Sequence, residues 1–408
     1  MENLKKIAHV QFFDKIGAVA LGTIIAYISW NLSIESAIFS SLLFFAYFYI
    51  NQRSYLFTLI LSYYLFASRG LLIGTENYYD SSYIATLIWL SASLLTTSVW
   101  ITIWSPSQKK RLLLFPIMLT LLIVPPIGFI SWVNPIISSA IIFPKFGFLG
   151  IVFYLLTLYL VTILLKDKQR ATQTIIIISL LFISTLIYKP IKKQKQNILY
   201  PINSNLKYKN QAVDFLGDYR RQKKLLLLAN RSKHDNLLFH ENALGSFNQN
   251  SMMIWERLDN NKTILAGAYI YKEVGGYDNV LIELNNRSSK IIYKQRVPVP
   301  ISMWQPWREQ GAKAYPFQNP TVEFQQSRVG VFICYEQLLT YTYLHTMFYE
   351  PQYIIGISNL WWVEDDSISE IQKRSLELWG RLFGKFTVYS ENNSCTNARV
   401  STFNLNQK

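Results

Sequence analysis

Three residues with chemically reactive side chains stand at the ends of short apolar runs in the second half of the chain. Glu241 and Lys294 each stand where such a run ends, and Cys334 directly follows the run Val329–Ile333. Apolar runs of four to eight residues bounded by polar ones are typical of buried strands. A cysteine nucleophile needs a base to take its proton and a cation or amide to hold an oxyanion, so these residue types could act together.

Each of the three also has an ordinary structural interpretation. Cys334 could be a buried core thiol, because free cysteine is among the most buried residue types. Glu241 and Lys294, taken singly, are more typical of solvated charges at strand ends. His345, on an expected helix after Cys334, has the pattern of a surface or packing residue. It is the combination that favours a catalytic site.

The apolar residues are concentrated in the first half of the chain. Half of the 408 residues are apolar, a composition that does not favour a purely soluble protein. An apolar stretch of about 20 residues is long enough to cross a bilayer as a helix. Seven segments are apolar enough to cross or nearly cross, several of them short for a span: 10–31, 36–50, 55–74, 83–105, 112–132, 148–165 and 172–188.

The basic residues between these segments predict their orientation. Positive charge precedes the first segment and recurs at Arg53, 109–111 and 166–170, whereas the alternate loops carry little of it. Because cytoplasmic loops carry the excess of Lys and Arg, the N-terminus is expected in the cytoplasm. Seven crossings then place the remaining chain on the other side. The lysines within 189–195 oppose this trend and could meet anionic headgroups there.

The texture of the sequence changes after about residue 197, and three parts are expected. They are a transmembrane helical domain at 1–189, a basic juxtamembrane linker at 190–209 and an α/β domain at 210–408. The expected helices are 210–223, 248–258, 337–348 and 367–384. The expected strands are Leu225–Ala229, Leu237–His240, Thr263–Tyr271, Val280–Leu284, Ile291–Lys294, Val329–Ile333, Tyr353–Ser358 and Phe386–Ser390.

Several function classes are not favoured by this sequence. The formal charge of +15 is spread over membrane flanks and a mixed-charge domain, without a nucleic-acid-binding motif. Two cysteines, Cys334 and Cys395, allow at most one disulfide, and the four histidines lack metal-ligand spacing. Gly275 and Gly276 favour a hairpin turn, since no phosphate-loop lysine follows them. Neither a metal nor another cofactor is expected.

The order and intervals of Glu241, Lys294 and Cys334 resemble those of the nitrilase (carbon–nitrogen hydrolase) superfamily. The glutamate motif is matched by Leu-Leu-Phe-His-Glu-Asn-Ala, although His240 stands where proline is usual. The lysine and cysteine motifs are matched by Ile-Tyr-Lys and Ile-Cys-Tyr-Glu. Later segments of the domain are matched at Ile357–Trp362, Arg374–Arg381 and Glu391–Asn393.

This resemblance implies an α-β-β-α sandwich and a role for each residue. Glu241 is expected to act as general base, Cys334 to form a thioester, and Lys294 to stabilise the oxyanion together with the backbone N–H of Tyr335. Glu336 is expected to orient Lys294 or the incoming nucleophile. The alternative for Glu336 is a strand-end carboxylate paired with a local Arg or Lys.

A membrane domain joined to such a domain is similar to two branches of the superfamily, the apolipoprotein N-acyltransferases and the TraB-type conjugal transfer proteins. Ser302 stands near the position where the acyltransferases carry a second essential glutamate. The stretch 298–307 looks more like the TraB branch. The acyltransferases end in a further apolar helix, and Ser401–Lys408 does not resemble one.

The expected function is therefore that of a multi-pass protein of the bacterial inner membrane, with its catalytic domain on the periplasmic face. It would move an acyl chain from a phospholipid through Cys334 to an amine, such as that of a lipoprotein. The alternatives are a TraB-like component of a conjugation apparatus, of uncertain activity, and a tethered amidase. Four tryptophans could line an acyl-chain entry or equally fill the core: Trp304, Trp307, Trp361 and Trp362.

Overall fold

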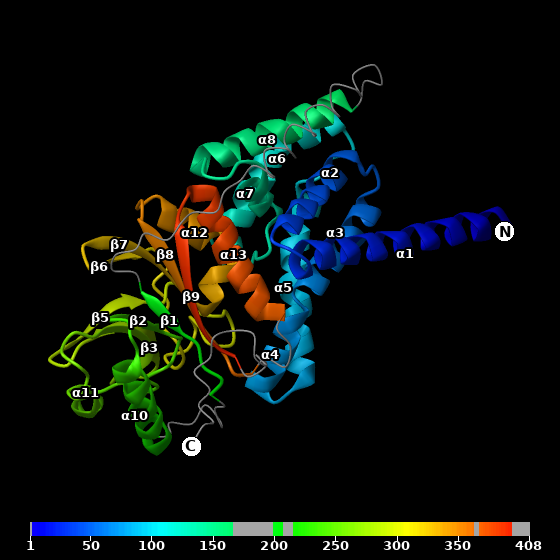
Figure 1. The fold of residues 1–408 in the computed structure, drawn as a ribbon. Helices are drawn as coiled ribbons and strands as arrows, with labels where there is room; N and C mark the ends of the chain where they lie inside the picture. The colour runs from blue at the N-terminus through cyan, green and yellow to red at the C-terminus, as the bar shows by residue number, and fades with distance from the viewer. Residues whose placement is uncertain (1, 166–198, 207–214, 363–366, 394–408) are drawn as a thin grey trace. The chain divides into compact units, whose positions relative to one another are not determined.

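A computed structural model describes residues 2–165, 199–206, 215–362 and 367–393 (Figure 1). Two compact units make up this part of the chain. The helical unit contains the described residues before 166 together with Leu339–Tyr341 and Glu377–Lys385. The sheet unit contains the other described residues.

The helical unit is built from apolar helices, as the sequence predicts. Its helices are α1 (Glu2–Asn31), α2 (Leu42–Tyr49), α3 (Arg53–Ala67), α4 (Arg69–Tyr79), α5 (Ser82–Thr102), α6 (Gln108–Ile123), α7 (Ser139–Ile142) and α8 (Gly147–Leu164). Three short 3-10 helices lie between them: η1 (Glu35–Ser41), η2 (Ile127–Phe129) and η3 (Pro135–Ser138). Aromatic rings fill its interior, where Phe44 stacks on Trp100 with ring centroids 5.7 Å apart.

Two described helices, α5 and α8, are long and apolar enough to cross a membrane. The helices α3 and α4 pass the same test as a pair bent by 51°, which gives up to three spans by length and composition. The shorter apolar helix Glu35–Tyr49 corresponds to the predicted segment 36–50. The predicted segment 172–188 lies outside the described residues, so the count of seven stays a prediction.

The sheet unit contains two sheets that pack face to face. The first has the strand order β1 (Tyr200–Ile202), β2 (Asn236–Phe239), β3 (Thr263–Tyr271), β4 (Tyr277–Leu284) and β5 (Ser289–Lys294). The second has the order β6 (Thr321–Phe324), β7 (Ser327–Ile333), β8 (Tyr353–Leu360) and β9 (Phe386–Asn393). Strands β1, β2 and β3 are parallel, as are β7, β8 and β9.

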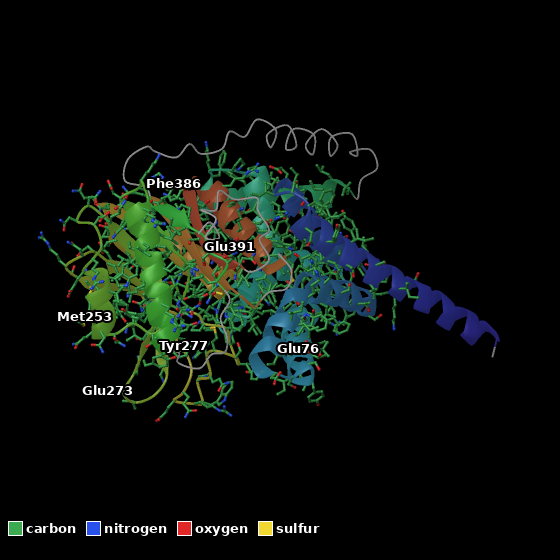
Figure 2. All side chains as sticks on the ribbon, turned by 60° about the horizontal axis from the view of Figure 1, so that its bottom comes forward. Glu76, Met253, Glu273, Tyr277, Phe386 and Glu391 are labelled. Atoms are coloured by element: carbon green, nitrogen blue, oxygen red, sulfur yellow. The ribbon has the colours of Figure 1, made fainter. Side chains whose placement is uncertain are left out.

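Helices cover the outer face of each sheet, which gives the expected α-β-β-α layering. One apolar cluster lies between the sheets and includes Leu238 and Tyr293 from the first and Val331 from the second. A second cluster joins the first sheet to α10 (Phe215–Arg231) and α11 (Gln249–Trp255). Close approaches at Gly330 and Gly356 show that α12 (Thr340–Met347) and α13 (Ser367–Phe383) cover the second sheet. Figure 2 shows the side chains, with Glu391 in β9 and Met253 on the exposed side of α11.

Most expected elements of the sheet unit are confirmed, and one is wrong. The run Leu225–Ala229 was expected as a strand but lies inside α10. Leu225, Leu226 and Ala229 are buried together with Gln222, a spacing that matches one face of a helix. Short apolar runs do not distinguish a strand from a buried helix segment. The strands β1 and β6 were not expected, and β1 places part of the predicted linker in the first sheet.

Candidate functional site

Cys334 occupies a sharp turn between a buried strand and a short helix. Strand β7 ends at Ile333, and the 3-10 helix η5 (Cys334–Leu338) begins at the cysteine itself. Cys334 has a φ of 48°, in the left-handed region that residues with a Cβ rarely adopt. The side chain is largely buried, with 8% of the residue exposed. Such a turn projects the thiol away from the line of the strand.

Glu336 fixes this turn through its fully buried carboxylate. One oxygen accepts a hydrogen bond from the backbone N–H of Ile333 at 2.7 Å, and the other from the N–H of Arg296 at 2.6 Å. The guanidinium of Arg296 lies 3.4 Å away, and the Tyr293 hydroxyl donates at 3.0 Å. These are contacts of a carboxylate paired with a local arginine. Glu336 therefore holds the cysteine turn and does not contact Lys294.

Glu241 lies beside Cys334 after strand β2 and is 3% exposed. Its carboxylate accepts hydrogen bonds from the Asn279 side chain at 2.7 Å and from the backbone N–H of Asn359 at 3.0 Å. It also shares a hydrogen bond with the Cys334 thiol. Gly267 in β3 permits this placement, because a Cβ there would lie 2.6 Å from the Glu241 Cα. The structure thus brings Glu241 and Cys334 together.

Burial controls the protonation of this pair. Burial raises the pKa of Glu241 to about 7, against the lowering effect of its hydrogen bonds with Asn279, Cys334 and Asn359. The pKa of the Cys334 thiol is raised well above its ordinary value, first by burial and then by the charge of Glu241. Near neutral pH the thiol keeps its proton while the carboxyl group is partly ionised. The pair is therefore suited to passing a proton from sulfur to carboxylate.

A side chain that sequence reasoning missed also reaches the sulfur. Gln372, buried in the sheet-unit part of α13, places its Nε2 3.8 Å from Cys334 Sγ. Its hydrogen bond lowers the pKa of the thiol, as does that of the Asn359 N–H. No local sequence signal marks Gln372, because it stands 38 residues from the cysteine on an amphipathic helix. Asn359 could have been found, since it falls in the motif Ile357–Trp362.

Lys294 does not join the other two residues of the predicted set. Its Nζ pairs with Asp278 Oδ2 at 2.7 Å and lies 5.1 Å from the centre of the Tyr315 ring. Its neighbour Gln295 is the residue that faces the site. Gln295 accepts a hydrogen bond from Asn279 at 3.0 Å and donates one to the carbonyl of Ile333, also at 3.0 Å.

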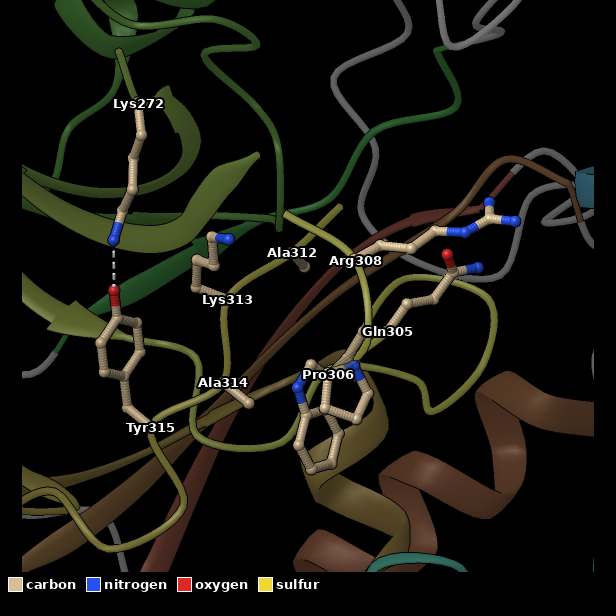
Figure 3. Close-up of a pocket in the computed structure, with 9 residues that line it drawn as sticks. Lys272, Gln305, Pro306, Arg308, Ala312, Lys313, Ala314 and Tyr315 are labelled. Atoms are coloured by element: carbon tan, nitrogen blue, oxygen red, sulfur yellow. Dashed lines mark hydrogen bonds between the residues drawn. The ribbon is translucent and has the colours of Figure 1, made fainter. Parts of the chain in front are cut away.

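A pocket of about 330 Å³ is lined in part by Tyr315, the residue whose ring lies beneath the Lys294 ammonium (Figure 3). Its lining includes three basic residues and no carboxylate: Lys272, Trp304, Gln305, Pro306, Arg308, Ala312, Lys313, Ala314 and Tyr315. The Tyr315 ring is shared, because Lys272 donates to its hydroxyl at 2.7 Å and Lys294 lies over its face. The pocket therefore has the charge to hold an anionic group.

The four predicted tryptophans lie in different surroundings. Trp304 lines the pocket, whereas Trp307 is 65% exposed. Trp362 packs against the small buried cluster of Leu360 and Ile368, and Trp361 is partly exposed. A shared role as a substrate channel stays a prediction, with Trp304 the member that lines a cavity.

Comparisons with known proteins identify the family. The carbon–nitrogen hydrolase family model matches residues 193–381. A probable conjugal transfer protein TraB of Sinorhizobium fredii is 30% identical over 340 residues, which cover 81% of this chain and 86% of that protein. This chain belongs to the TraB family of the carbon–nitrogen hydrolase superfamily. The conjugal transfer protein TraB of Agrobacterium fabrum is 29% identical over 350 residues, with 81% of each chain covered.

Among solved structures, the chain is similar to a carbon–nitrogen hydrolase from Helicobacter pylori. The TM-score is 0.33 and the sequence identity 12%, over 44% of this chain and 70% of that one. Membership of the superfamily implies a fold that is usually catalytic. In the present chain, Glu241 contacts Cys334, whereas Lys294 contacts Asp278.

Proposed function

We propose that this protein is a membrane-anchored component of a conjugal transfer system whose sheet unit transfers acyl groups through Cys334. The acyl donor would be a phospholipid and the acceptor an amine, such as that of a lipoprotein. The contact of the buried Glu241 carboxyl group with the Cys334 thiol carries this proposal. The names of the two TraB relatives support the conjugal setting.

The first half-reaction would acylate the cysteine. Glu241 accepts the thiol proton while Sγ attacks the carbonyl carbon of the phospholipid ester. The oxyanion is met by hydrogen-bond donors at the start of η5, for which the N–H of Tyr335 is the predicted group. The ester C–O bond then breaks, and the leaving alkoxide takes the proton from Glu241. The products are a thioester on Cys334 and a lysophospholipid.

The second half-reaction would release the acyl chain. An amine attacks the thioester carbon, and Glu241 takes a proton from its nitrogen. The C–S bond breaks, and the sulfur regains a proton from Glu241 as the amide leaves. Water in place of the amine would give a fatty acid instead. Which product forms depends on the nucleophile that reaches the thioester.

Two features favour a lipid donor. The helical unit contains α5 and α8, which are long and apolar enough to enter a bilayer. The basic pocket could hold the phosphate of a headgroup, with Trp304 at its wall. The charge of the loops supports a cytoplasmic N-terminus in an inner membrane, with the sheet unit on the periplasmic side.

Trapping the thioester tests this proposal directly. The full chain in detergent would be mixed with acyl-labelled phospholipid, and its intact mass measured with and without hydroxylamine. A hydroxylamine-sensitive adduct is expected in the wild type and in Cys395→Ala, and its loss in Cys334→Ala. Absence of any adduct from folded wild-type protein, across zwitterionic and anionic phospholipids, would reject phospholipid-dependent acylation.

A second candidate is a conjugation component whose fold is retained without turnover. The ion pair of Lys294 with Asp278, which holds the lysine away from Cys334, favours this second candidate. A mating assay separates the two, because a Cys334→Ala chain would restore transfer fully only if no acyl-enzyme is needed. A tethered amidase is the third candidate, and it would acylate Cys334 from a short amide with release of ammonia.

A further inference from the structure

The direction of the Lys294 side chain follows from the pairing of β4 with β5. Lys294 stands opposite Val280, and Tyr293 stands opposite Leu281. Leu281 and Tyr293 belong to the cluster between the two sheets, whereas Val280 belongs to the cluster beneath α10 and α11. Residues directly opposite each other in an antiparallel pair share a face. Lys294 therefore leaves the sheet on the face turned away from Cys334.

Contacts on that outer face hold Lys294 there. Its partner Asp278 is nearly buried and also pairs with Lys272 at 3.0 Å and with the Tyr315 hydroxyl at 2.6 Å. These contacts hold the pKa of Asp278 below its ordinary value despite its burial. The ammonium of Lys294 is thus engaged by a carboxylate on the opposite side of the sheet from the thiol.

The amide of Gln372 has an orientation that its neighbours dictate. Gln337 Nε2 donates to Ser358 Oγ at 2.8 Å, and Ser358 Oγ contacts Gln372 Oε1 at 2.8 Å. A serine hydroxyl has one proton, so Ser358 donates it to the Gln372 oxygen. The Gln372 nitrogen consequently faces Cys334 Sγ. Gln337 is itself fixed by a second bond to the carbonyl of Ile357 at 3.1 Å.

We propose that Gln372, and not Lys294, is the catalytic side chain that donates a hydrogen bond to Cys334 and stabilises charge developing on its sulfur. The donor at this position is neutral, and it is held in place by two further neutral residues, Gln337 and Ser358. This inference rests on the proposed function only in taking Cys334 to be the nucleophile. It deepens that function, because the donor to the sulfur is an amide supplied by α13.

The test measures the reactivity of the thiol without any acyl donor. The full chain carrying Cys395→Ser would be alkylated with iodoacetamide in detergent from pH 6 to pH 10, and the rate at Cys334 followed by mass spectrometry. Only the thiolate reacts, so the profile reports the pKa of the thiol. Gln372→Met keeps the size of the side chain and removes the donor. This variant is expected to slow alkylation about tenfold at pH 8, because a rise of about one unit in the thiol pKa lowers the thiolate fraction tenfold.

Lys294→Gln is the decisive comparison, with Lys290→Gln as the matched control. Lys290 lies on the same strand and is exposed, and it stands opposite Glu283 on the other face because the register shifts between Leu281 and Ile282. Both lysine variants are expected to alkylate within twofold of the parent chain. A slower rate in Lys294→Gln than in Gln372→Met would overturn the inference, as would an unchanged rate in folded Gln372→Met.

Ser358→Ala keeps the inference testable if Gln372→Met does not fold. It frees the Gln372 amide to rotate and is expected to slow alkylation about threefold, and a parent-like rate would overturn the inference. The outcomes also separate the two proposals. If Gln372→Met slows alkylation as expected but the wild type forms no adduct with phospholipid, only the proposed acyl transfer is rejected. An adduct formed equally well by Gln372→Met would reject only the role of Gln372.

Discussion

Two neighbouring pairs of residues, on strand β4 and at the end of strand β5, differ in charge because they face opposite sides of one sheet. The outer pair, Asp278 and Lys294, is an ion pair with its lysine side chain 38% exposed. The inner pair, Asn279 and Gln295, is neutral, 1% exposed and bonded side chain to side chain at 3.0 Å. Isolated charges are costly to bury, whereas hydrogen-bonded amides are tolerated. The comparison teaches that one residue of register decides which groups face the side of the sheet that holds Glu241.

The largest expected effect is on the inner side, at Glu241. Glu241→Gln keeps the shape of the side chain but removes the base, so acylation of Cys334 should fall by about two to four orders of magnitude. In the wild type, Glu241 accepts a proton only when ionised, so the rate should rise as the pH passes through about 7. Adduct formation over a pH series measures both. A variant that retains this rise would exclude Glu241 as the base.

Removal of the Glu336 charge should produce the next largest effect. Glu336→Gln leaves the guanidinium of Arg296 buried without its carboxylate partner. Loss of one partner from a buried ion pair costs about 3–5 kcal/mol of stability. Thermal unfolding in detergent should show a large fall in Tm. The exposed pair of Arg328 and Glu323 is the matched control, and Glu323→Gln should leave the Tm nearly unchanged.

The stability of the sheet unit should also depend on pH through Glu241. Burial raises the pKa of Glu241 from 4.5 to about 7, so the folded state keeps a proton that the unfolded state has released. Stability from this group is complete below the unfolded value and is lost as the pH rises from 4.5 to about 7. Glu241→Gln should thus gain about 3 kcal/mol over wild type at pH 8 and almost nothing at pH 4. An equal difference at both pH values would contradict this account.

A carboxylate placed on the inner side should sharpen the comparison. Asn279→Asp sets a second acid at hydrogen-bond distance from Glu241, and like charges favour the protonated form. The midpoint of the acylation profile should move up by about one pH unit or more. Asp278→Asn, one residue away on the outer face, is the matched control. A midpoint that moves equally in both variants would show that the faces are not separate.

The smallest effect is expected on the outer side, at Lys294. Lys294→Gln removes one of three partners of Asp278, which keeps Lys272 and the Tyr315 hydroxyl. A partly exposed ion pair contributes at most about 1 kcal/mol. Chemical unfolding of the full chain should detect a loss no greater than this, with unchanged thiol reactivity. A much larger loss would mean that the outer pair holds the fold of the site.

The sequence predicted the strand ends well, because buried strands are marked by apolar runs and the polar residues that follow them stand out. Glu241 and Cys334 were placed correctly at the ends of β2 and β7. The face of Lys294 was not predicted, since that depends on the pairing of β5 with β4 and not on the run itself. Gln372 was missed for a similar reason: its contact with sulfur exists only once α13 covers the second sheet. Leu225–Ala229 was misassigned because four leucines in a row fit either kind of element.

The buried surroundings of Cys334 have a consequence for the response of the thiol to salt. Dissolved ions screen interactions between charges, and they do so most strongly near the surface. The donors to Sγ are the Gln372 amide and the Asn359 N–H, which carry no net charge, and the nearby carboxylate of Glu241 is buried. The reactivity of Cys334 should therefore be nearly the same in dilute buffer and in molar salt. The partly exposed ion pair of Asp278 and Lys294 on the outer face should respond more strongly to ionic strength.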